Sequence, residues 1–156
     1  MALPDFKAAC DALAARFAPG TITTPTSGLA MRASFGQMPN AVPATPAVYV
    51  EPTDGEVVAD GGRWAHEWNI DVVFLVDKTT ADPKRIETQR QLWLPTLLGA
   101  TQGQVKLGIG TQVGWELAKA LPTGWRWDEV DVAGVDFAAI RVHYRAYVYE
   151  TVSLVA

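Results

Sequence analysis

The chain has 156 residues, of which 49% are hydrophobic and 19% charged, and its formal net charge is −4. This length suits one domain with one ordinary core, and the composition is too apolar for a disordered chain. The longest uncharged apolar run, residues 72–76, is far shorter than the roughly 20 residues that a bilayer span needs, and no secretory signal opens the chain, so we expect a soluble protein made in the cytoplasm.

The first predicted element is a helix that Pro4 and Asp5 open and that Pro19 and Gly20 end. Its apolar residues recur at offsets of four, three and four: Phe6, Cys10, Leu13 and Phe17. Cys10 is the only cysteine, so no intrachain disulfide can form, and its place on the apolar face predicts a buried, unreactive thiol.

Residues 21–46 are predicted to form a long extended arm, because they are rich in proline and small residues and favour neither a helix nor a central strand. Long loops of this kind are commonly functional. We therefore expect partner contacts here, through Arg32, Phe35 and Met38. Removal of residues 26–44 is expected to leave the domain folded.

The next residues predict a strand, a turn and a longer strand. Residues 47–51 have strand alternation, and residues 52–60 are predicted to be the tip of a hairpin, with a carboxylate group of Asp54, Glu56 and Asp60. From Trp64 to Val76 the side chains alternate over thirteen residues, which predicts the best strand in the chain. Trp64 and Trp68 share its apolar face and are expected in the core.

A second helix is predicted from Asp82 as N-cap and Pro83 at the first helical position, with Gly99 as its end and Pro95 as a kink or an early stop. Residues 101–114 are rich in glycine and predict a loop with a brief strand at residues 105–109.

Residues 115–155 predict a β-meander, interrupted at residues 122–124 and near residues 133–135. Its last strand carries one apolar face: Ile140, Val142, Tyr144, Ala146 and Val148. The opposite face carries Arg141, His143, Arg145, Tyr147 and Tyr149. Tyrosine and arginine are enriched in subunit interfaces. We therefore assign Arg141, His143, Arg145 and Tyr147 to an interface with a partner.

Nothing in the sequence predicts a catalytic, cofactor or metal site. His66 and His143 lie far apart and have no further ligands at zinc spacing. The glycines near residues 108–114 do not match a nucleotide-binding loop. Trp125 and Trp127 share a strand face and are expected in the core or in a subunit interface. The fold class that these elements predict is α+β, with a mixed, mainly antiparallel sheet of about four to five strands flanked by two helices.

The order of these elements, with "HEWNIDVVFLVD" in the long strand, a helix opened by "DP" and a final "GVDFAAIRVHYRAYVYE", resembles the tail terminator (tail-completion) family of long-tailed bacteriophages. The resemblance covers most of residues 1–156 as a single domain. It implies a structural virion protein and not an enzyme, at the head-proximal end of the tail, made in the cytoplasm of the host bacterium.

Members of that family, as the resemblance implies, form a hexameric ring that caps the tail tube, stops tube polymerisation and provides the joint to the head-tail connector. They carry no cofactor. The implied partners are further copies of the chain, the tube protein and the connector protein, and DNA passes through the lumen without specific binding. Asp54, Glu56 and Asp60 are candidates for the lumen surface.

Three alternatives stay open. One is another neck or head-tail connector protein, since the arm does not fix the choice within this group. A second is a small-molecule or peptide-binding module with its pocket between the long strand and the second helix. A third is an enzyme of a type that the sequence does not identify.

Overall fold

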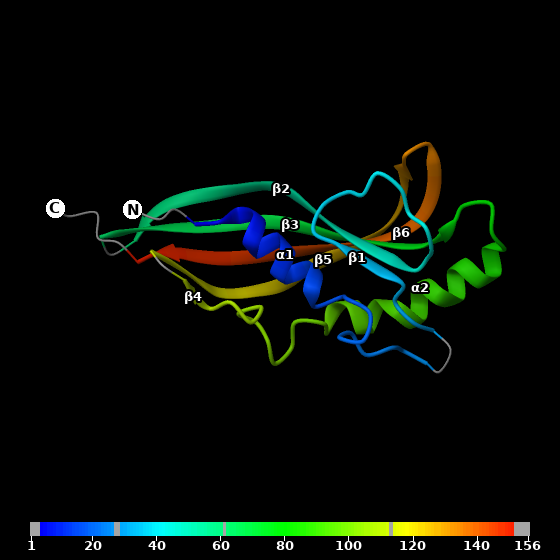
Figure 1. The fold of residues 1–156 in the computed structure, drawn as a ribbon, viewed down its shortest axis with the longest axis horizontal. Coiled ribbons are helices and arrows are strands. Elements are labelled where there is room, and N and C mark those ends of the chain that lie inside the picture. The colour runs from blue at the N-terminus through cyan, green and yellow to red at the C-terminus, as the bar shows by residue number, and fades with distance from the viewer. Residues whose placement is uncertain (1–3, 27–28, 61, 113, 152–156) are drawn as a thin grey trace.

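Two helices lie on one face of a long, twisted six-stranded sheet in the computed structural model (Figure 1). The structure describes residues 4–26, 29–60, 62–112 and 114–151, without the side chains of Asp60 and Arg63. The elements are α1 (Phe6–Ala15), β1 (Ala33–Phe35), β2 (Ala47–Asp60), β3 (Arg63–Lys78), α2 (Pro83–Leu98), β4 (Thr111–Gln112), β5 (Trp115–Val132) and β6 (Val135–Glu150).

The strand order is β1-β2-β3-β6-β5-β4, and only β1 and β2 pair in parallel. The predicted α+β class and the mixed, mainly antiparallel sheet are therefore confirmed. The predicted number of strands was too low, because β1 and β4 have three and two residues. Strands of that length show no alternation that a sequence pattern can detect.

The main core lies between the helices and one face of the sheet. Strand β3 contributes alternate residues, as the period of two predicts: Trp68, Ile70, Val72, Phe74 and Val76. The predicted apolar face of β6, from Ile140 to Val148, joins the same core. Phe74 packs against Trp93 of α2 with ring centroids 5.0 Å apart, and neither side chain has exposed surface. Trp64, which was expected in the core, is 41% exposed because it lies near the end of the β2–β3 hairpin.

Both helices begin as the sequence predicts. The Asp5 carboxylate accepts a hydrogen bond from the backbone N–H of Ala8, and Asp82 does the same for Lys84. These bonds satisfy N–H groups that have no partner inside the helix. Cys10 is buried in α1, and burial raises the pKa of its thiol to about 11. The thiol therefore stays protonated at neutral pH, in agreement with the predicted unreactive role.

Helix α2 continues past Pro95 to Leu98, so the proline does not end it early. Proline has no N–H to donate to the preceding turn. The end of the helix is instead tied to the sheet, because the buried Tyr144 hydroxyl donates to the carbonyl oxygen of Leu97 at 2.8 Å.

The expected hairpin tip at residues 52–60 is wrong, because β2 continues to Asp60. A β-bulge between Pro52 and Asp54 accommodates the proline, which is tolerated because no further strand pairs with β2 at that point. Gly55 is required in this strand, since a Cβ atom there would lie 2.8 Å from the carbonyl oxygen of Glu67. Asp54 and Glu56 are therefore strand residues and not turn residues.

The structure does not show an extended arm at residues 21–46. Ile22 and Met31 are buried in the main core, and the Ser34 hydroxyl donates to the carbonyl oxygen of Ala14 at 2.6 Å. Phe35 and Val42 pack against a second, smaller core cluster on the other face of the sheet. The segment therefore wraps around the β1 edge and contributes to both cores. Removal of residues 26–44 would delete β1 and Met31, so we now expect it to destabilise the domain.

The strand expected at residues 105–109 is also wrong, because this stretch consists of turns and β4 lies at Thr111–Gln112. The expected interruption at residues 122–124 is a β-bulge within a continuous β5. The turn near residues 133–135 is confirmed. Ala133 and Gly134 both have positive φ, at 52° and 85°, which matches the tight two-residue hairpins that suit twisted strands.

Phe74→Ala is expected to lower the free energy of unfolding by about 3 to 5 kcal/mol, because it removes a fully buried ring from the centre of the main core. Denaturant melts would measure the loss. The control is Leu92→Ala on α2, where the side chain is 38% exposed and the change should stay below about 1 kcal/mol. A loss of that small size for Phe74→Ala would show that the face is not buried.

Candidate functional site: the open face of the sheet

The face of the sheet that the helices leave uncovered, here called the open face, carries most of the polar side chains of the four long strands. Its apolar end is the second core cluster: Tyr49, Val73, Leu75, Val130, Val132, Phe137 and Ala139. Its polar part follows from the same alternation that sends apolar residues to the helices, because neighbouring side chains on a strand point to opposite faces.

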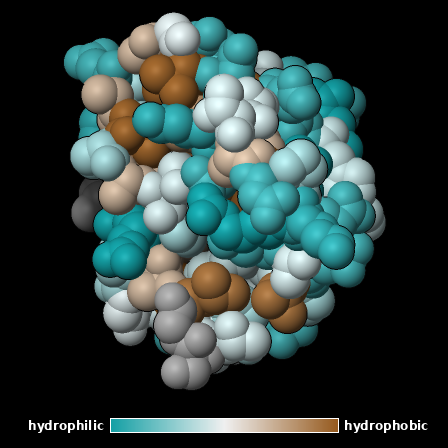
Figure 2. All heavy atoms as spheres, turned by 90° about the vertical axis from the view of Figure 1, so that its right-hand side faces the viewer, coloured by the Kyte–Doolittle hydropathy of each residue, from teal (hydrophilic) through white to brown (hydrophobic). Residues whose placement is uncertain are grey.

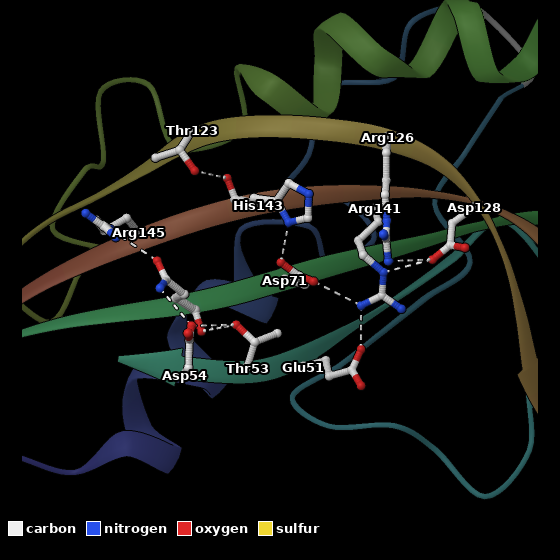
Figure 3. A network of polar contacts seen from close by, with 11 residues as sticks. Glu51, Thr53, Asp54, Asp71, Thr123, Arg126, Asp128, Arg141, His143 and Arg145 are labelled. Atoms are coloured by element: carbon white, nitrogen blue, oxygen red, sulfur yellow. Dashed lines mark hydrogen bonds and ion pairs between the residues drawn. The ribbon is translucent and has the colours of Figure 1, made fainter. Parts of the chain in front are cut away.

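At the centre of the open face, Arg141 of β6 binds three carboxylates, which come from three different strands (Figure 3). Its Nη1 atom lies 2.5 Å from Glu51 Oε2 of β2 and 3.0 Å from Asp71 Oδ2 of β3. Its Nε atom donates to Asp128 Oδ2 of β5 at 2.9 Å. These four residues, the Arg141 cluster, connect all four long strands through side chains.

The Arg141 cluster is only partly exposed to water. The Arg141 side chain is 12% exposed and that of Asp71 is 9% exposed. Partial burial disfavours the charged form of Arg141, but its hydrogen bonds with Glu51, Asp128 and Asp71 outweigh this and raise its pKa. Burial likewise raises the pKa of Asp128, while the Arg141 hydrogen bond and the N–H of Glu129 lower it more strongly, so the net shift is downward.

A second set of contacts extends the cluster along the open face toward the β2–β3 hairpin. His143 Nδ1 lies 2.6 Å from Asp71 Oδ1. Asn69 is the next link, since its Nδ2 donates to Asp54 Oδ1 at 2.7 Å and its Oδ1 accepts from Arg145 Nε at 3.1 Å. Figure 3 shows His143 beside Asp71, and Arg145 and Asp54 farther along the same face.

The structure brings together two groups of residues that the sequence assigned to different surfaces. Arg141, His143, Arg145 and Tyr147 lie on the open face of β6, as expected from their alternation. Asp54 and Glu56 of β2 lie on the same face, opposite Asn69 and Glu67 of β3. The predicted interface residues of β6 and two of the predicted lumen residues therefore share one surface.

The remaining predicted site residues lie elsewhere. Arg32 is exposed beside Pro46, whose carbonyl oxygen accepts its backbone N–H at 2.9 Å. Met38 is 47% exposed, and Phe35 packs against the second core cluster. The Asp60 side chain lies outside the described residues.

Sequence reasoning missed Glu51, Asp71 and Asp128 as members of the site. One signal was present in Asp71, a carboxylate within the otherwise apolar run from Ile70 to Val76. A carboxylate in a buried strand requires a partner. The identity of that partner depends on strand pairing, which the sequence does not display.

The His143–Asp71 pair has the geometry of an acid-base dyad, but the residues that line the hollow beside it do not supply a strong nucleophile. Together with Thr53, Asp54 and Asn69 it lines a shallow hollow, and none of these five residues is a serine or a cysteine that could act as a strong nucleophile. Among the residues that the structure describes, no group of three or more His, Cys, Asp and Glu side chains is arranged to hold a metal ion.

Comparisons with known proteins add no relatives: no protein-family model matches the chain, and the search of curated proteins finds no similar sequence. Within the described ranges, no helix is long and apolar enough to span a membrane.

Arg141→Met is expected to lower the free energy of unfolding by about 3 kcal/mol at pH 7, because it leaves partly buried carboxylates without their cation. The lowered pKa of Asp128 means that its stabilisation of the wild type is present above about pH 4 and is lost as pH falls through the folded-state pKa. In the variant the carboxylates become protonated more readily. The deficit relative to the wild type should therefore shrink as pH falls below about 4, as measured by denaturant melts from pH 7 to about pH 3.

The control is Arg126→Met on the same face. The Arg126 side chain is 61% exposed, and its contact with Asp128 is a long one, at 3.6 Å. Its effect should stay below about 1 kcal/mol. An Arg141→Met deficit that is the same at about pH 3 and pH 7 would contradict the ionic role of Arg141.

Proposed function

We propose that this chain is a tail terminator of a long-tailed bacteriophage. Copies of the chain form a ring, a hexamer by the family resemblance, on the head-proximal end of the tail tube. The ring stops the addition of tube subunits and provides the joint to the head-tail connector. Support comes from the order of helices and strands, and above all from the open face, with its acidic and fixed arrangement of charges.

The charge of the open face suits a surface past which DNA moves. In the Arg141 cluster three carboxylates surround one guanidinium. With all four groups ionised, the cluster is therefore negatively charged. The exposed Arg126 lies beside the carboxylate of Asp128, and an acidic surface repels phosphates and lacks the affinity that would hold DNA in place. We assign the open face to the lumen side of the ring. Arg141 acts there as a structural cation and not as an interface anchor.

The Arg141 cluster also suits a ring subunit whose sheet must stay rigid. A terminator ring has to match the diameter of a tube, so its subunits cannot flex across the sheet. Side-chain bonds from one arginine to three other strands add lateral links to the backbone ladder. The curvature of the sheet is therefore held by ionic contacts as well as by the core.

The alternative of a small-molecule or peptide-binding module requires a pocket between β3 and α2. The space next to the middle of β3 is filled by Phe74 and Trp93. A hollow lies near the end of β3, where Val76 and Asp77 line it together with Arg85 and Gln89 of α2. Binding of a peptide there by a monomeric chain, without any affinity for tubes, would favour this alternative over the terminator.

The terminator proposal predicts that removal of the protein during infection yields tails of uncontrolled length. Electron microscopy of particles would measure the lengths. The protein added back in purified form should bind purified tail tubes at one end only, as a ring whose mass is a multiple of that of the chain. Binding along the sides of the tubes, or tails of normal length without the protein, would contradict the proposal.

The lumen assignment makes a separate prediction. Asp54→Lys, at an exposed position on the open face, should leave folding and tail length unchanged, since exposed charges contribute little to stability. Each copy in the ring then changes by two charges toward positive, so genome ejection should slow, and more strongly at low salt. The control is Glu87→Lys on the exposed side of α2, which changes the same charge away from the open face. Equal ejection rates for the two variants would remove the open face from the lumen.

A further inference from the structure

The end of the β2–β3 hairpin is an exposed apolar surface at one extreme of the elongated molecule, at the left in Figure 1. Val57 is 60% exposed, Val58 is 51% exposed and Trp64 is 41% exposed. Val57 lies opposite His66 and Val58 opposite Ala65, so the two valines point to opposite faces of the hairpin. The tip therefore exposes an apolar side chain on each of its two faces, unlike a sheet that has one buried face and one polar face.

Among the side chains of the tip that the structure describes, Glu56 is a negative charge without an ion-pair partner. Glu56 and Glu67 lie directly opposite each other across β2 and β3. Like charges in this position destabilise a strand pair. Arg145 contacts Glu67 at 3.3 Å, whereas Glu56 is exposed next to the two valines. A cation from outside the molecule would relieve this repulsion.

A groove of complementary character runs along α2. This helix lies in the right half of Figure 1. Two hollows of about 310 and about 510 Å³ share Leu29, Arg85 and Gln89 and so form one groove, with room for several side chains. Leu29 and Leu92 supply apolar surface. Figure 2 looks onto this end of the molecule and shows hydrophobic side chains in small groups among hydrophilic ones.

The cations of the groove are exposed: Arg32, Lys84 and Arg85. Two carboxylates also line it, but both have partners. Asp77 pairs with Arg85, and Asp82 accepts the backbone N–H of Lys84 at 3.1 Å. The groove therefore offers apolar surface flanked by Lys84 and Arg32, and the tip offers apolar side chains beside Glu56.

We propose that the β2–β3 tip of one copy of this chain docks into the α2 groove of the next copy. The two surfaces differ and lie in opposite halves of the molecule, so the contact is head-to-tail, and repetition with a fixed rotation closes a ring. This inference rests on the proposed ring in requiring that copies associate, but it does not depend on what the ring caps.

The test uses two variants of the full chain. The tip variant is Glu56→Lys with Val57→Thr, which removes the negative charge and the most exposed apolar side chain while keeping a β-branched residue in the strand. The groove variant is Lys84→Gln with Arg85→Gln, which lowers the charge of the groove by two and creates no acidic partner for the altered tip. Circular dichroism melts should match the wild type, and Val57→Thr alone replaces the tip variant if the double substitution does not fold.

Sedimentation velocity and native mass measurement give the outcome. The wild type should form closed oligomers, and each variant should associate at least about tenfold more weakly. An equimolar mixture of the two variants should form dimers and nothing larger, because one intact tip and one intact groove remain. The matched control, Lys106→Glu, makes the same charge change in a loop that lines neither surface and should associate like the wild type.

Three results would overturn the inference: a wild type that remains monomeric up to about 1 mM, a variant that still forms the wild-type oligomer, or a variant mixture that stays monomeric. Rings of wild-type size from the tip variant that still cap tubes would leave the terminator proposal standing and remove only this contact. A head-to-tail ring without affinity for tube ends would support this contact and contradict the terminator proposal.

Discussion

The two central strands, β3 and β6, contribute side chains both to the core under the helices and to the polar open face. The alternation of apolar and polar residues along each strand makes this possible. Every second side chain, such as Phe74 on β3 and Ile140 on β6, enters the core under the helices. The intervening residues include Asp71 and Arg141, which lie on the open face and are largely shielded from water. A slip of one residue in the pairing would exchange the two sets and bury charges under α2. The register, the two cores and the open face therefore depend on one another.

The Arg141 cluster is the electrostatic result of this arrangement. Charges removed from water must find partners, and the nearest partners of Arg141 lie on three other strands. The cluster thus specifies which strands lie side by side, in a sheet whose backbone ladder alone would tolerate other orders. The same contacts leave the surface acidic. Stability and surface charge are in this way set by the same four side chains.

The parts of the fold that the sequence predicts are those in which many residues repeat one local preference. The strand from Trp64 to Val76, the helix after Asp82 and the apolar face of β6 belong to this kind. The predictions that were wrong concern segments whose conformation depends on a single tertiary contact. Pro52 and Gly55 resemble a turn until the bulge and the close approach of the Glu67 carbonyl oxygen are known. The four members of the Arg141 cluster come from four separate segments, so only the face of Arg141 was predictable and not its partners.

Two of the β-bulges contain a proline, and they bear on how the chain behaves in a crowded cell before it meets any partner. One lies in β2 at Pro52 and the other in β5 at Pro122, and these are the long strands nearest the two sides of the sheet. Strand β1 covers only residues 47–49 of β2, and β4 covers only residues 115–116 of β5. Beyond those points a proline without an N–H and a broken ladder discourage another chain from adding a strand. At Pro52 and Pro122 the two sides of the sheet therefore disfavour the addition of a strand from another copy, and association there is left to side chains.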